Sequence, residues 1–159
     1  MCQKQAKVAS VFPAIQLKEM SPEEIEQVYL IESLSFSAPW ARESLENAID
    51  NPFAINLVAI VENEIRGFVM AIFRQEAMHI INLAVHPKAR RCSIGRNLLK
   101  ELLIWAQQKK VLWAFLEVRS QNFSAISLYE REGFLLIERI PAYYANDGDD
   151  GLIMAKFLS

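Results

Sequence analysis

The sequence predicts a single α/β (α+β) domain with a mixed, mostly antiparallel central sheet and helices on both faces. One observation is the length, because 159 residues suit one domain. Another is the composition, 52% hydrophobic and 23% charged, which is ordinary for a chain that buries a sizeable core. A third is the order of the predicted elements, in which strand-like apolar runs are interspersed with amphipathic helix patterns. We expect residues 1–13 to form a flexible extension and residues 14–159 to form the domain.

The chain starts with one predicted strand and two predicted helices. A short strand over residues 15–20 precedes Ser21-Pro22-Glu23-Glu24, a capping-box pattern with proline at the first helical position. The helix that begins there is expected to bury a face made of Ile25, Val28, Tyr29 and Leu34. Residues 35–40 contain Pro39 and interrupt this helix, and a second helix is expected over residues 41–49.

Three strands are predicted next. Residues 53–61 and 67–73 are apolar runs connected by Glu62-Asn63-Glu64, a pattern typical of a hairpin turn. Residues 78–85 form a third run, long enough for a buried strand. Pro87 fits the end of that strand because proline has no backbone donor.

The second half predicts two helices and three strands. A helix from residue 95 to about residue 108 has one apolar face, made of Leu98, Leu99, Leu102, Leu103 and Ala106. Residues 111–118 are apolar on both faces, which predicts a central strand covered on both sides. A short helix over residues 122–132 is stopped by Gly133, and residues 134–140 and 152–157 are the last two strands.

A basic turn of small residues joins the strand over residues 78–85 to the helix that follows it. The turn contains Arg90, Arg91 and Ser93 and reaches Gly95 and Arg96. The first N–H groups of a helix lack intrahelical partners and lie at its positive dipole end, so this turn can hold phosphate. It lacks the GxxxxGK[ST] spacing of a nucleotide P-loop. The alternative is an ordinary connection with solvated arginines.

Three side chains further along are candidates for chemistry. Glu117 ends an otherwise apolar strand, where a partly desolvated carboxylate can serve as a general base. The alternative is a strand-end glutamate that reaches solvent or pairs with Arg119. Asn122 and Tyr129 are seven residues apart and share one helix face. Their alternatives are a helix N-cap and a core tyrosine.

Two stretches resemble the Gcn5-related N-acetyltransferase (GNAT) family. Arg90-Arg91-Cys92-Ser93-Ile94-Gly95 resembles its acetyl-CoA loop, Q/R-x-x-G-x-G/A. Glu117-Val118-Arg119 through Asn122 and Leu128-Tyr129 to Gly133-Phe134 resembles its pattern E-V-R-x-x-N-x-x-A-x-x-L-Y-x-x-x-G-F. The resemblance covers about residues 15–158. Ser93 replaces the first loop glycine, which costs about 1 kcal/mol if the backbone there is left-handed, although its hydroxyl could donate to a phosphate oxygen.

The resemblance implies acetyl-CoA as co-substrate, no metal, and a role for each matched position. Glu117 would take a proton from the amine, and Tyr129 would protonate the departing CoA thiolate. Asn122 would bond the pantetheine or phosphate arm. Backbone groups that would bond the acetyl and pantetheine arm belong to Leu83, Ala84 and Val85. Amides that would hold the pyrophosphate belong to Arg91, Cys92, Ser93, Ile94, Gly95 and Arg96.

Looser signals bear on the acetyl acceptor. Ser37 to Trp40 and Tyr143-Tyr144 with a later Asp-Gly are similar to family members that acetylate the N-terminal alanine of a small-subunit ribosomal protein. An α-amine has a pKa of about 7.7–8.0 and lysine about 10.4, so a single glutamate is better matched to an α-amine. The alternatives are a family member acting on lysine or a small-molecule amine, and a non-catalytic acyl-CoA-binding domain.

We expect a cytoplasmic protein that contacts neither nucleic acid nor membrane. A net charge of −2 gives no bulk attraction to nucleic acid, and no apolar run reaches the roughly 18 residues of a membrane span. Residues 1–11 lack the apolar core of a secretory signal. Cys2 and Cys92 lie far apart and predict neither a metal site nor a disulfide framework, so Cys92 is expected to be an incidental thiol. The oligomeric state stays open, a monomer included.

Overall fold

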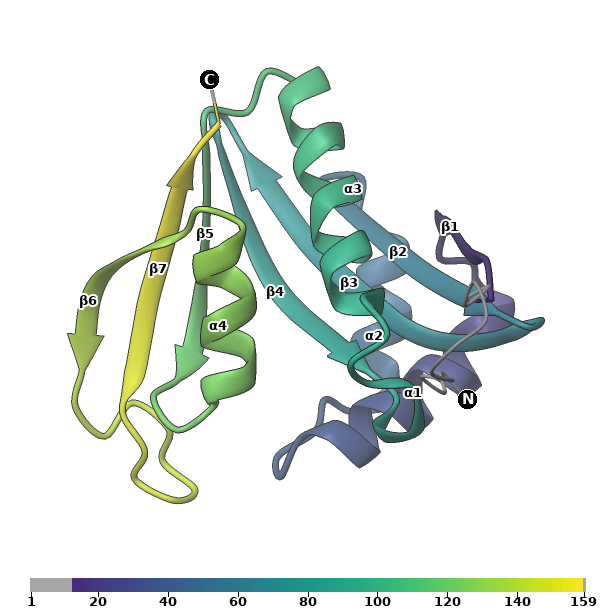
Figure 1. The fold of residues 1–159 in the computed structure, drawn as a ribbon, viewed down its shortest axis with the longest axis horizontal. Helices are drawn as coiled ribbons and strands as arrows, with labels where there is room; N and C mark the ends of the chain where they lie inside the picture. Colours follow the sequence, from purple (N-terminus) through teal and green to yellow (C-terminus); the bar gives the residue numbers. More distant parts are fainter. Residues whose placement is uncertain (1–12, 159) are drawn as a thin grey trace, which may run out of the picture.

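The computed structural model describes residues 13–158 as one seven-stranded sheet flanked by helices (Figure 1). The extension expected over residues 1–13 lies almost entirely outside the described residues. The strands are β1 (Ile15–Glu19), β2 (Ala54–Val61), β3 (Glu64–Arg74), β4 (Ala77–Val85), β5 (Trp113–Arg119), β6 (Leu135–Ile140) and β7 (Gly151–Phe157). The helices are α1 (Ile25–Ser35), α2 (Arg42–Ile49), α3 (Ile94–Gln108) and α4 (Phe123–Arg131), with 3-10 turns η1 (Pro22–Glu24) and η2 (Pro87–Ala89).

The strand order is β1-β2-β3-β4-β5-β7-β6, and only the β4–β5 pair is parallel among the described strands. Helices α1 and α2 cover one face, while α3 and α4 cover the other (Figure 1). The predicted fold class and the order of elements are therefore confirmed.

Helix α3 packs closely on the sheet because β3 carries a glycine beneath its first turn. A Cβ added to Gly67 would lie 2.9 Å from Ile94 Cγ2 and 3.1 Å from the Ala84 carbonyl oxygen. Glycine therefore permits this approach, which fixes where the helix begins above β4. The apolar face predicted for this helix is confirmed, since Leu98, Leu99 and Leu102 are fully buried.

The buried face of α1 differs from the prediction. Ile25 and Val28 are buried, but Tyr29 and Leu34 are exposed. Their places are taken by Ile31 and Glu32, so the helix buries a carboxylate. The apolar residues of this segment lie on all sides of the helix, and only packing against β3 and β4 selects the stripe that is buried.

Strand β5 is central, as predicted, but only one of its faces is fully covered. Ala114, Leu116 and Val118 are buried, whereas Trp113 is exposed and packs beside Phe157 at 4.7 Å between ring centroids. The prediction of double coverage was wrong because α1 and α2 pack on β2, β3 and β4 and leave this part of their face open. Glu117 lies on the open side.

Strands β4 and β5 separate partway along their length. Their parallel ladder ends at the Ile80–Leu116 pair. On its other edge, β4 is bulged: Met70 of β3 pairs with Asn82 and Ala71 pairs with Ile80, which leaves Ile81 as the extra residue. Beyond this point the strands diverge toward the lower end of the sheet (Figure 1).

Candidate active site

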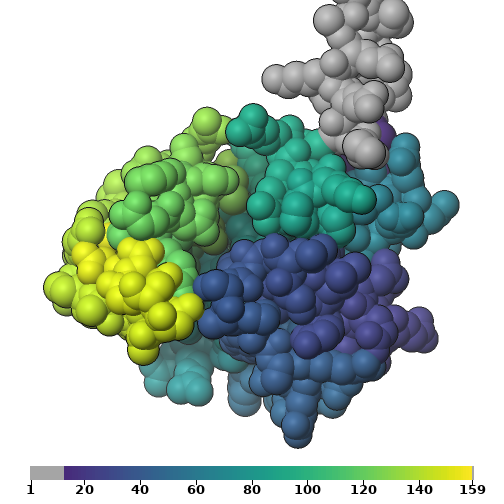
Figure 2. All heavy atoms as spheres, turned by 90° about the horizontal axis from the view of Figure 1, so that it is seen from below, coloured from purple at the N-terminus to yellow at the C-terminus, as the bar shows by residue number. Residues whose placement is uncertain are grey.

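A cleft of about 460 Å³ opens where β4 and β5 diverge. Seen from below, the surface is hollowed between the C-terminal half of the chain and the blue and teal half (Figure 2). Its walls come from β4, β5 and α4 and from the α1–α2 and β6–β7 connections. A second cavity of about 480 Å³, lined by Phe53, Phe73, Arg74 and Gln75, contains none of the predicted site residues.

The cleft brings together residues that the sequence places far apart. Leu83, Glu117, Asn122 and Tyr129 all line it. Ala84 and Val85 continue β4 from the cleft toward the turn before α3. Among the described strands, none pairs with the edge of β4 that faces β5 from Ile81 to Val85, so its main-chain groups are available to a ligand.

Glu117 is paired with His79, which is not among the predicted site residues. His79 Nε2 lies 2.5 Å from Glu117 Oε2, and the imidazole stacks on Phe115 at 4.5 Å with an angle of 6° between the rings. His79 pairs with Phe115 across the ladder, and Glu117 follows two residues later on the same face. Sequence could not reveal this contact because it depends on the register of two strands 38 residues apart.

Arg119 does not pair with Glu117, contrary to the alternative considered for that glutamate. Its Nη1 donates to both carboxylate oxygens of Asp147 at 2.7 and 2.8 Å, and Nη2 donates to Asn146 Oδ1 at 2.8 Å. The guanidinium also lies 4.0 Å from the ring centroid of Tyr144. Asn146 in turn donates to Ser37 Oγ at 3.2 Å, so the β6–β7 and α1–α2 connections meet at the rim of the cleft.

Tyr129 is 7% exposed, and its ring packs against Phe134 at 5.8 Å between centroids. Within residues 13–158 its hydroxyl makes no hydrogen bond, although the side chain lines the cleft. Burial, with a smaller effect of nearby Tyr144, raises the pKa of Tyr129 well above its ordinary value. The hydroxyl therefore stays protonated through the neutral range and can donate to a ligand.

Two further residues shape the walls. Asn122 caps α4, since its Oδ1 accepts from the Ala125 amide at 3.2 Å, which confirms the cap alternative while leaving its Nδ2 available. Glu32 lines the cleft at 1% exposure, and burial raises the pKa of its carboxyl despite hydrogen bonds that act in the opposite direction. Glu32 could not be predicted from the sequence, because a charged residue in α1 is expected to face solvent.

The turn before α3 has the backbone of an anion site. Arg91 and Ser93 have φ of 62° and 63°, and the first helical bond runs from the Asn97 amide to the Ser93 carbonyl at 2.9 Å. Within residues 13–158 the amides of Arg91, Ser93, Ile94, Gly95 and Arg96 make no hydrogen bond. Left-handed residues in such a turn point successive amides into one concavity. Ser93 therefore has the left-handed backbone conformation in which a serine in place of the family's glycine costs about 1 kcal/mol.

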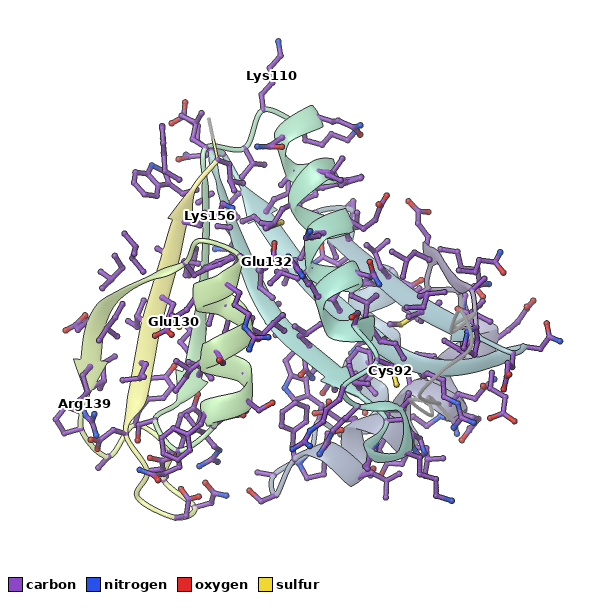
Figure 3. All side chains as sticks on the ribbon, viewed as in Figure 1. Cys92, Lys110, Glu130, Glu132, Arg139 and Lys156 are labelled. Atoms are coloured by element: carbon purple, nitrogen blue, oxygen red, sulfur yellow. The ribbon has the colours of Figure 1, made fainter. Side chains whose placement is uncertain are left out.

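Side chains anchor this turn to its surroundings. Arg90 Nε donates to the Val85 carbonyl at 3.2 Å, and Arg96 Nε donates to Glu132 Oε1 at 2.8 Å, which ties α3 to the end of α4. Cys92 lies where the turn meets α3 (Figure 3) and is disulfide-bonded, so the expectation of an incidental thiol was wrong. The spacing of cysteines along the sequence does not determine whether they pair.

Within residues 13–158 no helix is long and apolar enough to cross a membrane. The same residues contain no group of three or more His, Cys, Asp or Glu side chains placed to hold a metal ion.

The fold and cleft define an N-acetyltransferase. Residues 25–134 match the model of the acetyltransferase (GNAT) family, and the chain belongs to that family. It is similar to enzymes named [ribosomal protein bS18]-alanine N-acetyltransferase. The one from Haemophilus influenzae is 30% identical over 138 residues, covering 85% of this chain and 93% of its own.

Two more comparisons agree. A Bacillus subtilis protein, which carries that name as a provisional assignment, is 31% identical over 139 residues, covering 87% of this chain and 92% of its own. The crystal structure of the Escherichia coli ribosomal-protein-S18-alanine N-acetyltransferase superposes with a TM-score of 0.86 at 25% identity. That alignment covers 92% of this chain and 95% of the other.

Proposed function

We propose that this protein transfers an acetyl group from acetyl-CoA to the N-terminal alanine of the small-subunit ribosomal protein bS18. The observation that carries the proposal is that Glu117 of β5 and Tyr129 of α4 line one cleft beside the unpaired edge of β4. The names of the relatives support the choice of acceptor.

The cleft fits acetyl-CoA at both ends. At the turn, the unpartnered amides of Ser93, Ile94, Gly95 and Arg96 suit the pyrophosphate at a helix N-terminus. The main chain from Leu83 to Val85 suits the amide-bearing pantetheine arm, because an open strand edge offers both donors and acceptors. The thioester then lies near Leu83, at the end of the cleft that Glu117 and Tyr129 share.

The reaction we propose is direct transfer between two bound substrates. The neutral amine attacks the thioester carbonyl carbon, the C–N bond forms and Glu117 accepts the proton that the nitrogen loses. The main-chain N–H groups of the β4 edge stabilise the oxyanion of the tetrahedral intermediate. When the C–S bond breaks, Tyr129 donates a hydrogen bond to the developing thiolate and then its proton. Tyr129 enters the step protonated, because the ordinary pKa of a tyrosine is already about 10 and burial raises the pKa of Tyr129 further.

The acceptor side of the cleft is formed by the two connections that meet through Asn146 and Ser37. Trp40 and Tyr144 line it, and burial raises the pKa of Tyr144 to about 12 although Arg119 partly opposes this. Near neutral pH roughly a tenth of an α-amine with a pKa of about 7.7–8.0 is already neutral, against fewer than one in a thousand for lysine with a pKa of about 10.4, so one carboxylate suffices as base.

The test offers the protein acetyl-CoA and a peptide that begins with the N-terminal alanine of bS18 and contains an internal lysine. We expect one acetyl group, located by mass spectrometry on the α-amine, at a rate above that for polyamines, aminoglycosides or the same peptide with its N-terminus blocked. Faster acetylation of lysine or a small amine would replace the acceptor. A stoichiometric acetyl-CoA complex without turnover on any amine would identify a non-catalytic binding domain.

A further inference from the structure

We propose that His79 is a positioning residue for Glu117. Its Nε2 holds one carboxylate oxygen at 2.5 Å, so that the other oxygen is presented to the acceptor amine. The inference rests on the proposed function, because His79 acts through the base assigned there. His79 is not among the residues that line the cleft, so we expect it to act through Glu117 and not on the substrates directly.

The place of Glu117 in the sheet explains why it needs such support. The last pair of the β4–β5 ladder is Ile80 with Leu116, so Glu117 is the first residue of β5 beyond it. From there, within residues 13–158, β5 is paired only with β7, and Glu117 lies opposite Ile153. The side-chain contact with His79 therefore spans the two strands one residue after their backbone pairing ends.

The position of His79 is fixed by its strand pairing and by ring stacking. It lies one residue before the end of the ladder, opposite Phe115, and its ring stacks flat on that phenyl ring at 4.5 Å. Its side chain is 35% exposed, against 26% for Glu117, so the pair lies at the boundary between sheet and solvent. A glutamate this exposed samples several rotamers unless a partner selects one.

The contact also keeps Glu117 from a competing partner. Arg119 is two residues further along the same face of β5, within the reach of a freely moving glutamate. In the structure Arg119 forms an ion pair with Asp147, and Glu117 is in contact with His79. Within residues 13–158 Glu117 Oε1 has no hydrogen-bond partner, which leaves it for the amine. Losing the His79 contact would let Glu117 turn toward Arg119, where a carboxylate paired with a guanidinium is a poorer base.

The test is a double-mutant cycle with two replacements of His79. His79→Phe keeps a flat ring for stacking on Phe115 but has no nitrogen, whereas His79→Gln keeps a polar group that can reach Glu117. We expect His79→Phe to lower kcat at least tenfold with the KM for acetyl-CoA unchanged, and His79→Gln to retain most of kcat. In the Glu117→Gln background, His79→Phe should cause no further loss of kcat.

Three results would overturn the proposal: near-wild-type kcat in His79→Phe, an equal loss of kcat in the Glu117→Gln background, or a matching loss of acetyl-CoA affinity. The last two are what a purely structural role predicts. The cycle is run on whichever amine the wild type acetylates, so a wrong acceptor does not affect it.

A second readout needs no turnover. The chain has two histidines, and the imidazole ¹⁵N resonances of His79 should shift in Glu117→Gln while those of His86 stay in place. Unchanged His79 resonances would show that the contact does not exist in solution.

Discussion

Glu32 of α1 and Asn82 of β4 are 50 residues apart in the chain, yet Asn82 Nδ2 donates a 2.6 Å hydrogen bond to Glu32 Oε2. The other carboxylate oxygen accepts from the Trp40 amide at 2.9 Å. One buried side chain thereby ties α1, the α1–α2 connection and the bulged part of β4 together at the wall of the cleft. The cost is a carboxylate removed from water, which is why its pKa is raised.

Glu32→Gln should stabilise the protein more as pH rises. The folded-state pKa of Glu32 lies above the unfolded value of about 4.3, so the unfolded state loses this proton first and wild-type stability falls as pH climbs through that window. Glutamine does not titrate and can keep both bonds if the Asn82 amide turns over. Melting temperatures of both proteins from pH 4 to pH 8 check this.

Glu101→Gln is the matched control, because Glu101 is exposed on α3. The melting temperature of Glu101→Gln is measured over the same pH range, and the difference from wild type is compared with that of Glu32→Gln. If the difference in melting temperature between Glu32→Gln and wild type did not change with pH, burial would not raise the pKa of Glu32 in the folded protein.

Glu117→Gln should fold and bind acetyl-CoA normally but lose kcat by a factor on the order of 10² or more, as expected for a general base. The loss should shrink as pH rises, since more of the amine is then already neutral. The measurement is kcat against pH with the acetyl-CoA Kd as control. Near-wild-type kcat at neutral pH, with chemistry rate-limiting, would exclude Glu117 as the base.

Tyr129→Phe should lower kcat by a similar order without lowering the melting temperature. The hydroxyl makes no hydrogen bond within residues 13–158, and phenylalanine keeps the contact with Phe134, so packing loses nothing. A variant that melts several degrees lower would instead indicate that the hydroxyl supports the fold.

Gly95→Asp should abolish the stabilisation that acetyl-CoA gives the wild type, about 2.7 kcal/mol at a hundredfold excess over Kd. A Cβ at Gly95 would be in ordinary contact with Leu128 and Val85, at 3.4 and 3.5 Å, so the backbone accepts it, and the substitution adds a negative charge in the first turn of α3, beside the proposed pyrophosphate site. Gly95→Ala and the neutral Gly95→Asn separate bulk from charge. A ligand-induced melting shift that survives in Gly95→Asp would place the pyrophosphate elsewhere.

Ser93→Gly should stabilise the unliganded protein by about 1 kcal/mol, because glycine tolerates the φ of 63° at this position. Its affinity for acetyl-CoA should be similar or weaker, since the strain is present with and without ligand and the hydroxyl is lost. Ser93→Ala retains the strain and isolates the hydroxyl. A tenfold gain in affinity for Ser93→Gly, about 1.4 kcal/mol, would mean that the serine distorts the phosphate site.

Local sequence patterns were sufficient to predict the helices and strands and to identify the candidate site residues. The capping box at Ser21, the hairpin at Glu62 and Asn63, and the apolar stripe of α3 are each determined by neighbours in sequence. The turn before α3 was recognisable for the same reason: its chemistry depends on a helix N-terminus and the residues immediately before it.

Contacts that depend on strand register were not predictable. The bulge at Ile81, the pairing of His79 with Glu117 and the burial of Glu32 against Asn82 all require knowing which residues of separate elements face each other. The buried face of α1 and the coverage of β5 were predicted wrongly for the same reason, because both depend on which other elements pack against them. A one-residue shift of register would remove each of these contacts while leaving every local pattern unchanged.

The diverging strands also bear on how such a protein can evolve. A ligand held by the amides of a turn and the edge of β4 is recognised through atoms that every amino acid except proline supplies. Under the proposed binding mode, substitutions along these segments that keep the main chain in place and add neither charge nor bulk at the ligand leave these contacts intact. If the donor is bound in this way, selection on these segments should act on conformation more than on side-chain identity.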